Sequence, residues 1–433
     1  MVASGAELIN VWLVFTSHVY EDGGTKNDPF LYGSSSKKLL YMPPSKTSIS
    51  VNRNIALSTI AIFFFWMSLY FYVPFLPIHT LELGASNTVL GIVIASYAIG
   101  QILLRIPVGI ASDLLGRRKP FVLLAFIASS VGALGLFFAP SPFVLFLARS
   151  LTGVAGAGWV AITVLYISYF HSSKTDQAMS WVMFVNAFGI VVATFVGGVI
   201  GELYGGVSTF FAGFISGLIG TILILLIKEP WQLSQTAMSW ADFLKVGRNP
   251  LLLRISFIGI LIHFVTFAVS FSFVPVYAVS IGATEFQNGL IAGAMFIFSA
   301  TGNLTTPKFV EKFGYRNTLV FGLFIIALSV AVIPFLHSPV LLMVSQAAGG
   351  LGRGMSQLIL MTLAVLVVPG ATRTTSMGIY QALYAIGMFA GPVIAGFVAD
   401  YSGVLSVFWV CAVISLVSCV IAVKCPVRAP SQG

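Results

Sequence analysis

The chain has 433 residues, of which 58% are hydrophobic and only 8% are charged, whereas charged residues make up about 25% of an ordinary soluble domain. Such a chain cannot cover itself with polar surface, so a soluble globular protein is excluded. The formal net charge of +9 comes from loops and tails, and we do not interpret it as a sign of nucleic-acid binding.

The chain begins with a polar segment, residues 1–54, that we expect to be cytoplasmic, disordered and without a core. It contains one short apolar run, Leu8 to Phe15, which is too short to span a bilayer and lacks the layout of a signal peptide. Met42 is a candidate for the native start, which N-terminal sequencing would test.

Twelve apolar stretches follow, and each is long enough to cross a hydrocarbon core of roughly 30 Å. The first six are Ile55–Leu76, Thr88–Ala111, Phe121–Ala139, Phe143–Ser168, Ala178–Glu202 and Val207–Ile227. The second six are Leu251–Ser280, Phe286–Phe309, Thr318–Leu336, Val340–Val368, Ser376–Ala399 and Val404–Val423. We therefore predict an all-α integral membrane protein with two six-helix bundles, 55–227 and 251–424, joined by a cytoplasmic loop, 228–250, and followed by a cytoplasmic tail, 425–433.

The distribution of cations predicts the orientation, because Lys and Arg accumulate in cytoplasmic loops. With a cytoplasmic N-terminus, all but three of the 22 Lys and Arg fall on the cytoplasmic side, and Arg105, Arg149 and Arg353 lie inside helices. We predict a multi-pass protein of the cell membrane with both termini in the cytoplasm. The three cysteines lie in or just after the last span, and we expect free thiols, with acylation of Cys425 as the alternative.

The two halves are copies of one unit, because a single shift of 198 residues aligns most of them. The paired positions include Gly84 with Gly282, Gly116 with Gly314, Gly205 with Gly403, and Glu202 with Asp400. Six helices return the chain to the same side, so we predict parallel repeats related by an axis along the membrane normal. Two such bundles enclose a central cavity and can rock about a site near mid-membrane.

A charged turn between the second and third spans carries a motif, Gly109-Ile110-Ala111-Ser112-Asp113-Leu114-Leu115-Gly116-Arg117-Arg118-Lys119. A carboxylate at the C-terminal end of a helix opposes the macrodipole at a cost of a few tenths to ~1 kcal/mol, so Asp113 needs cations close by. Gly116 permits the tight turn that brings Arg117 and Arg118 back toward it. The second half repeats this arrangement less strictly with Glu311, Gly314 and Arg316.

The motif, the twelve spans and the repeat together resemble the major facilitator superfamily, and its drug-efflux branch in particular, over roughly residues 55–424. The resemblance implies two pseudo-symmetric six-helix bundles and a secondary transporter that works by alternating access. It also implies a latch that closes the cytoplasmic side, formed by Asp113, Arg118 and Arg373, with counterparts at Glu311, Arg316 and Lys174. The alternative is that these charges are topological signals and solvated loop residues.

Two motifs depart from the family patterns. The fourth span contains Arg149-Ser150-Leu151-Thr152-Gly153, which resembles the Arg-x-x-Gln-Gly pattern of proton-coupled members with Thr in place of Gln. The fifth span has Ala193-Thr194 where the family's drug antiporters carry Gly-Pro, and that pair occurs instead at Gly391-Pro392. Close packing through small residues explains the glycines of both spans in either case.

Three arginines and one histidine are the ionisable groups expected inside the membrane, because none of the 13 acidic residues is predicted deep in a helix. A charge near mid-bilayer costs at least ~2.5 to 3.5 kcal/mol on insertion scales, so each must face a cavity or a partner. Arg353, with Gln357 one turn away, is expected to contact a polar or anionic substrate group or to bond backbone carbonyls. Arg149 is expected to serve coupling or cavity architecture, and Arg105 an inter-bundle contact.

A polar stripe crosses the seventh span, where His263, Thr266 and Ser270 recur at helical spacing. Histidine changes its charge near neutral pH, so His263 is a candidate proton-responsive site, with a hydrogen-bonded packing residue as the alternative. Three residues of the first span are candidates to line an amphipathic pocket, with ordinary helix packing as the alternative: Trp66, Tyr70 and Tyr72.

These features favour a carrier over other classes of protein. The sequence has no Gly-x-x-x-x-Gly-Lys-Ser/Thr loop and no clustered nucleophile, base or metal ligands, so neither a built-in ATPase, an enzyme nor a cofactor is predicted. We predict efflux of amphipathic or weakly anionic compounds, with protons as the candidate coupling ion. Uptake of a sugar, carboxylate or similar metabolite is the alternative, and solute sensing is the remote one. The expected partners are a small-molecule substrate and the bilayer, and the expected state is a monomer.

Overall fold

Long apolar helices separated by short turns make up nearly all of the described chain. The structure is a computed structural model that describes residues 47–171, 174–229, 245–369 and 372–424, without the side chains of residues 47–50, Asp113, Asp176 and Thr374. The predictions for Met42, for the run from Leu8 to Phe15 and for Cys425 lie outside the described residues. Within the described ranges the structure contains no strand, as the predicted all-α class requires.

The first half contains the first six predicted spans. Its helices are α2 (Thr47–Tyr70), α3 (Leu76–Glu82), α4 (Asn87–Leu114), α5 (Lys119–Phe137), α6 (Pro142–Ala157), α7 (Trp159–Ile167), α8 (Thr175–Tyr204) and α9 (Ser208–Leu226). The first span is thus interrupted between α2 and α3, and the fourth is divided at Gly158. Proline stands in the first turn of α3, α5 and α6, where its missing amide hydrogen costs nothing.

The second half contains the other six spans. Its elements are α11 (Pro250–Ala268), the π-helical turn η2 (Val269–Phe273), α12 (Val274–Ser280), α13 (Glu285–Val332), η3 (Ile333–Phe335), α14 (Pro339–Leu366), α15 (Arg373–Ser402) and α16 (Val404–Val423). The long α13 joins the eighth and ninth predicted spans, because only Gly314, at φ 78° and ψ 163°, leaves the helical conformation between them. The described chain therefore has 11 helical stretches of membrane-spanning length, one of which is double.

The internal repeat reappears in the backbone. Six glycines of the described residues have positive φ, and they form three pairs separated by the predicted shift of 198 residues: Gly84 and Gly282 at 80° and 84°, Gly116 and Gly314 at 60° and 78°, and Gly205 and Gly403 at 85° and 84°. A side chain is strained in this left-handed region, so each turn selects glycine. The two halves therefore turn their chains in the same way at the same places.

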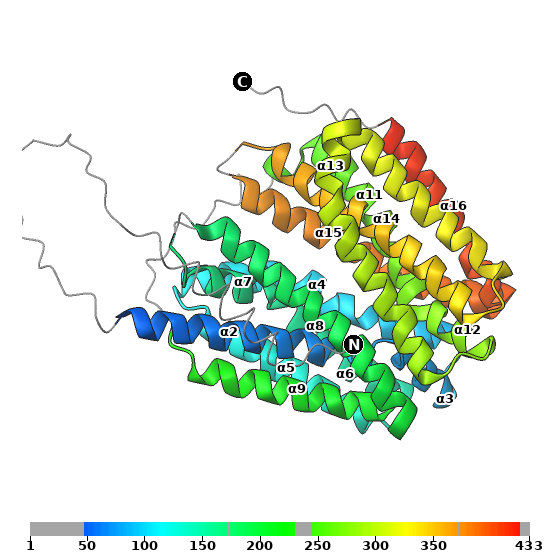
Figure 1. Ribbon diagram of the computed structural model, residues 1–433, viewed down its shortest axis with the longest axis horizontal. Helices are drawn as coiled ribbons and strands as arrows, with labels where there is room; N and C mark the ends of the chain where they lie inside the picture. Colours follow the sequence, from blue (N-terminus) through cyan, green and yellow to red (C-terminus); the bar gives the residue numbers. More distant parts are fainter. Residues whose placement is uncertain (1–46, 172–173, 230–244, 370–371, 425–433) are drawn as a thin grey trace, which may run out of the picture. The chain divides into compact units, whose positions relative to one another are not determined.

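The two halves meet along two seams, where α4 contacts α15 and α8 contacts α13. Figure 1 shows α2 to α9 and α11 to α16 as two groups of helices. Glycine permits the approach at equivalent positions of both seams: a Cβ at Gly91 would lie 2.1 Å from the Pro392 carbonyl oxygen, and one at Gly289 would lie 2.7 Å from that of Thr194. Small residues thus bring the helix backbones of the two halves into contact.

Candidate functional site

Charged side chains divide the helix ends into two kinds. The described Lys and Arg that lie outside helix interiors occur where α2 and α8 begin, in the turns after α4 and α9, around the start of α11, at the bend of α13, at the start of α15 and at the end of α16. We call this the basic end. The opposite, acidic end carries Glu82, Glu202, Glu285 and Asp400.

At the acidic end each seam is closed by a carboxylate that caps a helix of the other half. Asp400 at the end of α15 accepts hydrogen bonds from the amide of Asn87 (2.9 Å), its Nδ2 (3.0 Å) and the amide of Thr88 (2.8 Å). Glu202 at the end of α8 accepts from the amide of Phe286 (3.0 Å). Both acids sit at helix N-termini, which favour negative charge. Glu202 and Asp400 are repeat partners, and so are Thr88 and Phe286, so the two caps are related by the repeat.

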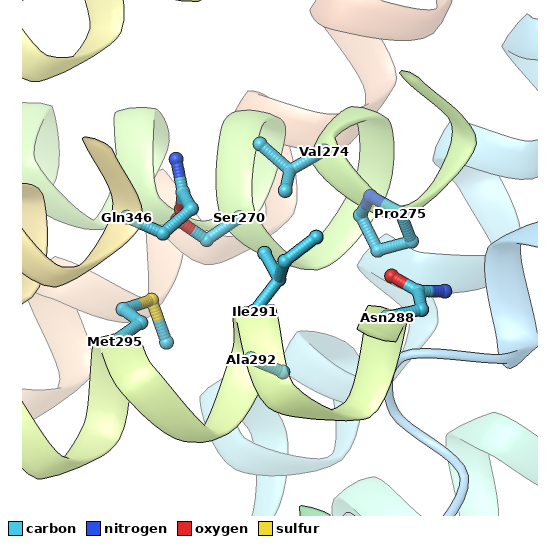
Figure 2. A pocket seen from close by; sticks show the side chains of 8 residues that line it. All are labelled: Ser270, Val274, Pro275, Asn288, Ile291, Ala292, Met295 and Gln346. Carbon is cyan, nitrogen blue, oxygen red and sulfur yellow. The ribbon is translucent and has the colours of Figure 1, made fainter. Parts of the chain in front are cut away.

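Tight packing continues from the acidic end toward the centre. Asn288 of α13 donates to the Pro74 carbonyl of the first half (3.0 Å), and Ser270 in the π-turn donates to Gln346 Oε1 (2.9 Å). Figure 2 shows the small cavity beside these residues, whose volume is about 10 Å³. Such a volume holds one water molecule at most, so this cavity has no room for a solute.

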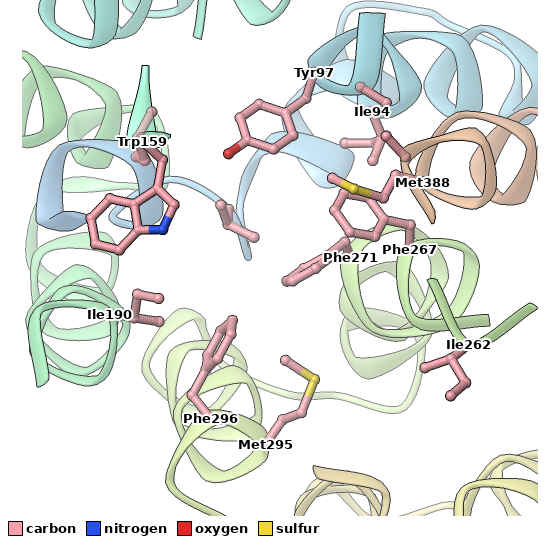
Figure 3. Close-up of a cluster of buried hydrophobic side chains, with 14 of the residues drawn as sticks. Ile94, Tyr97, Trp159, Ile190, Ile262, Phe267, Phe271, Met295, Phe296 and Met388 are labelled. Atoms are coloured by element: carbon pink, nitrogen blue, oxygen red, sulfur yellow. The ribbon is translucent and has the colours of Figure 1, made fainter. Parts of the chain in front are cut away.

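A cluster of aromatic side chains from both halves fills the space further in. We call it the central cluster; its members are Trp66, Tyr70, Tyr97, Trp159, Phe271 and Phe296. Ring centroids lie 5.0 Å apart between Trp66 and Trp159, 5.3 Å between Tyr70 and Phe296, and 6.4 Å between Tyr70 and Phe271. Figure 3 shows Tyr97, Trp159, Phe271 and Phe296 pointing toward one another. The prediction included Trp66 and Tyr70 as lining residues but did not identify Trp159, Phe271 or Phe296.

Three polar groups of this region lack hydrogen-bond partners among the described residues. The Arg353 guanidinium lies 5.9 Å from the ring centre of Phe271 and 5.8 Å from that of Phe296, and no hydrogen bond to another described residue holds it. One turn away on α14, Gln357 Oε1 is buried without a partner, and so is the indole nitrogen of Trp66. An unpaired buried polar group costs about 1–3 kcal/mol. A cation, an acceptor and a donor are thus left for something other than the described chain.

Arg149 is held differently, within the first half. Its Nη1 donates to the Tyr72 hydroxyl (3.3 Å) and to Thr152 Oγ1 (3.4 Å), and its guanidinium lies 4.5 Å from the ring centre of Tyr97. Only 5% of Arg149 is exposed. This residue therefore positions two tyrosines, one of which belongs to the central cluster, and its charge is compensated by cation–π contact.

The predicted inter-bundle contact of Arg105 is present in the α4–α15 seam. Its Nη1 donates to the Tyr384 hydroxyl (3.1 Å), and the Tyr384 ring stacks on His263 with centroids 4.0 Å apart and planes at 5°. His263 Nδ1 lies 2.8 Å from the Gly259 carbonyl oxygen, and the side chain is 6% exposed. These contacts match the packing alternative for His263. Thr266, next on the predicted stripe, bonds the Ile262 carbonyl of its own helix (2.8 Å).

The loop motif at the basic end lies beside the end of α9. The Arg118 amide donates to Glu229, and Lys119 Nζ donates to the carbonyls of Leu225 (2.9 Å) and Ile227 (2.6 Å). A cation at the last carbonyls of a helix complements its dipole. The motif therefore ties α5 to α9 within the first half.

The predicted latch is only partly within the described structure. The side chain of Asp113 lies outside the described residues, and Glu311, Arg316 and Arg373 are exposed. Gly109 has room, since a Cβ there would meet its first neighbour at 4.0 Å, and Gly116 makes the expected turn. Next to this region Tyr169 donates to the Lys228 carbonyl (3.0 Å), and burial, with the nearby Glu229 carboxylate, raises the pKa of Tyr169.

Two repeated helical halves, joined at one end around a central polar-aromatic site, define a membrane carrier of the alternating-access type. The chain matches the Major Facilitator Superfamily over residues 58–282 and 255–432. It belongs to that family, as its loop motif and repeat indicate.

Similar proteins include transporters with named activities. The chain is 27% identical over 385 residues to the multi-drug resistance efflux pump PmrA of Streptococcus pneumoniae, covering 86% of this chain and 96% of that protein. It is 25% identical over 379 residues to an uncharacterized MFS-type transporter of Methanocaldococcus jannaschii, covering 85% and 96%. Its fold resembles a bacterial homologue of the human lysosomal transporter Spinster, in an inward-facing and unoccupied conformation, with a TM-score of 0.71 at 15% identity, covering 88% and 98%.

Proposed function

We propose that the protein is a secondary transporter that exports amphipathic or weakly anionic aromatic compounds by alternating access, with the central cluster and Arg353 as its substrate site. The efflux direction is supported by the relation to PmrA, which is named a multi-drug resistance efflux pump. In this proposal the basic end faces the cytoplasm of a cell-membrane protein, because Lys and Arg are retained on that side.

Arg353 is the observation that carries the proposal. It is a cation between two aromatic rings, without a hydrogen-bonding partner among the described residues. In a desolvated site, a hydrogen bond to a charged group contributes about 1.5–3 kcal/mol. No described Asp or Glu lies between the two ends of the helices. The site therefore favours an anion or a strong acceptor and disfavours a permanent cation.

Counterflow in proteoliposomes with three naphthalene probes tests this selectivity. Anilinonaphthalene sulfonate carries an anion, its unsulfonated parent is neutral, and a trimethylammonium derivative is a permanent cation. We expect the anion to exchange fastest and the cation slowest, because all three fill the aromatic cluster but only the first pairs with Arg353. Preference for the cation would refute the assignment. Exchange of sugars or simple carboxylates in place of the probes would favour the uptake alternative.

We further propose protons as the coupling ion, because no ATPase motif is present. Imposing a pH gradient across the same proteoliposomes should accelerate probe accumulation, and an unchanged flux would exclude the coupling. The proposal includes the latch of Asp113, Arg118 and Arg373 as the gate of the basic end. It also includes two bundles, at 55–227 and 251–424, and a monomeric state. Replacing Asp113 by Asn should slow transport while leaving probe binding intact.

A further inference from the structure

A groove near the basic end runs between the second part of α13 and the last helix, α16, which contact each other (Figure 1). We call it the α13–α16 groove. Its volume is about 350 Å³, and ligand sites begin at about 300 Å³. At 1.5 Å per residue, its wall on α13 extends about 10 Å from the basic end into one leaflet of the bilayer. Polar side chains line its mouth and apolar ones line the rest: Arg316, Asn317, Val320, Phe321, Phe324 and Val423.

The cations at the mouth of the α13–α16 groove have no partner in the described protein. Arg316 is exposed, and its guanidinium makes no hydrogen bond or ion pair with another described residue. Lys424 follows Val423 at the end of α16, and its side chain is likewise exposed and unpaired among the described residues. The mouth is therefore a site of uncompensated positive charge, at the depth where lipid headgroups begin.

The equivalent cleft of the first half, between α5 and α9, is closed. There Lys119 Nζ donates to the carbonyls of Leu225 and Ile227 at the end of α9. Phe126 is fully buried, and a Cβ at Gly220 of α9 would lie 2.9 Å from its ring. An ammonium group and an aromatic ring thus fill this cleft from within the protein.

The second half lacks both fillings, although the repeat relates the two clefts. A shift of 198 residues places Asn317 where Lys119 stands and Phe324 where Phe126 stands. The Asn317 side chain is shorter than that of lysine and carries no charge, so it cannot replace the ammonium group. Phe324 is 52% exposed instead of buried. The α13–α16 groove is therefore the open counterpart of a cleft that the first half fills.

We propose that the α13–α16 groove binds one anionic phospholipid of the leaflet at the basic end, with its phosphate at Arg316 and an acyl chain along Phe321 and Phe324. The groove lies between two membrane-spanning helices, so its occupant comes from the bilayer. A negative group at the mouth and a long apolar part behind it are the two features that the lining requires. Basic pockets between membrane-spanning helices on the cytoplasmic side bind anionic headgroups. The inference does not depend on the transport function proposed above.

Native mass spectrometry of the full-length protein in detergent tests the charge part. The protein is titrated with phosphatidylglycerol or with phosphatidylcholine of the same acyl chains. We expect one phosphatidylglycerol to bind more tightly than phosphatidylcholine. Arg316→Gln should weaken phosphatidylglycerol binding about fivefold, because one cation near the headgroup is lost. Arg254→Gln is the matched control, since Arg254 of α11 is exposed at the same end and does not line the groove. It should bind both lipids as the wild type does.

Filling the apolar part tests the shape of the site with all charges kept. Val423→Trp places a large ring in the groove and should abolish tight phosphatidylglycerol binding. Val420→Trp is its control, because Val420 is 55% exposed on the same helix, close to the 44% of Val423, and does not line the groove. Arg316 is exposed, so Arg316→Gln leaves the fold intact and keeps the test decisive even if Val423→Trp does not fold.

Three results would overturn the inference. Equal affinity of the wild type for the two lipids would show that annular lipid alone covers the groove. Equal losses in Arg316→Gln and Arg254→Gln, or in Val423→Trp and Val420→Trp, would place the bound lipid elsewhere. Release of phosphatidylglycerol by inorganic phosphate would assign the mouth to a free anion, because a lipid held by its acyl chain is not displaced by its headgroup chemistry alone.

Discussion

Neutralising Asp400 should shift the equilibrium between the closed and open acidic end. The carboxylate accepts three hydrogen bonds, from Asn87 N, Asn87 Nδ2 and Thr88 N, at 2.8 to 3.0 Å, and it sits at the N-terminus of α4. Asp400→Asn keeps the shape and one acceptor but removes the charge. The lost interaction between the carboxylate and the helix dipole is about 0.3–1 kcal/mol. The hydrogen bonds to this group, no longer assisted by its charge, lose up to half their strength. Because the carboxylate is exposed, we expect Asp400→Asn to destabilise the closed acidic end by about 1 kcal/mol in total. This is a roughly fivefold change in the ratio of open to closed populations.

Pulsed electron spin resonance distances across the acidic end measure this ratio. Spin labels replace Leu203 on α8 and Tyr401 on α15, which belong to different halves and are 67% and 86% exposed, in a protein without native cysteines. Asp400→Asn should increase the fraction of long distances about fivefold. Glu202→Gln, which removes the charge from a single hydrogen bond to Phe286, should increase the same fraction about twofold. Glu82→Gln is the control, because its side chain bonds His79 of the same half, at 3.4 Å, and caps no helix of the other half among the described residues. An unchanged distribution in Asp400→Asn, or a shift as large in the control, would refute the cap.

Three further changes address the centre and the seams. Arg353→Gln should weaken equilibrium binding of anilinonaphthalene sulfonate roughly 10- to 150-fold without changing the melting temperature, because it removes a charge-assisted hydrogen bond of about 1.5–3 kcal/mol. Equal affinity of the variant and the wild type in a fluorescence titration would exclude pairing of Arg353 with the anion. Gly91→Ala should populate the open acidic end, because the new Cβ would lie 2.1 Å from a carbonyl oxygen across the seam and overpacking costs about 1–3 kcal/mol. Gly378→Ala is the control: its Cβ would meet nothing within 4 Å, so this variant should behave as wild type in the spin-label assay. Tyr384→Phe removes the hydroxyl that accepts from Arg105. It should speed labelling of a reporter cysteine in the basic half of the α4–α15 seam. An unchanged labelling rate would show that this hydrogen bond does not hold the seam closed.

The backbone turns were predictable from the sequence, and the caps across the seams were not. A positive φ selects glycine, so the pairs Gly84 with Gly282 and Gly205 with Gly403 leave a visible mark at a fixed shift. Glu202 and Asp400 were equally visible as repeat partners. Their contacts were not, because the groups that they cap are backbone amides, which have no residue-type signature.

The centre of the site shows the same division. Arginines stand out in apolar helices because their insertion is costly, and Arg353 was identified for that reason. Phe271, Phe296 and Trp159 were missed, because 13% of the chain is aromatic and an inward ring has the same composition as a lipid-facing one. The π-turn that contains Ser270 and Phe271 also left no sequence signal; it adds a residue to a turn and thereby changes which side chains of the seventh span face the centre.

The differences between the halves indicate where the conformational change is concentrated. At the acidic end both seams have a carboxylate cap and a glycine contact at equivalent positions, so closing that end involves both seams alike. Toward the basic end the α4–α15 seam has a hydrogen bond from Arg105 to Tyr384. Asn303 of α13 and Asn186 of α8 occupy the equivalent sites of the other seam, and within the described chain no hydrogen bond joins these two asparagines. A rocking motion that opens the basic end therefore meets more resistance at α4–α15, and α8 and α13 separate with less cost. The proposed substrate site lies between these unequal seams, so in this proposal the α8–α13 side is the favoured side for loading.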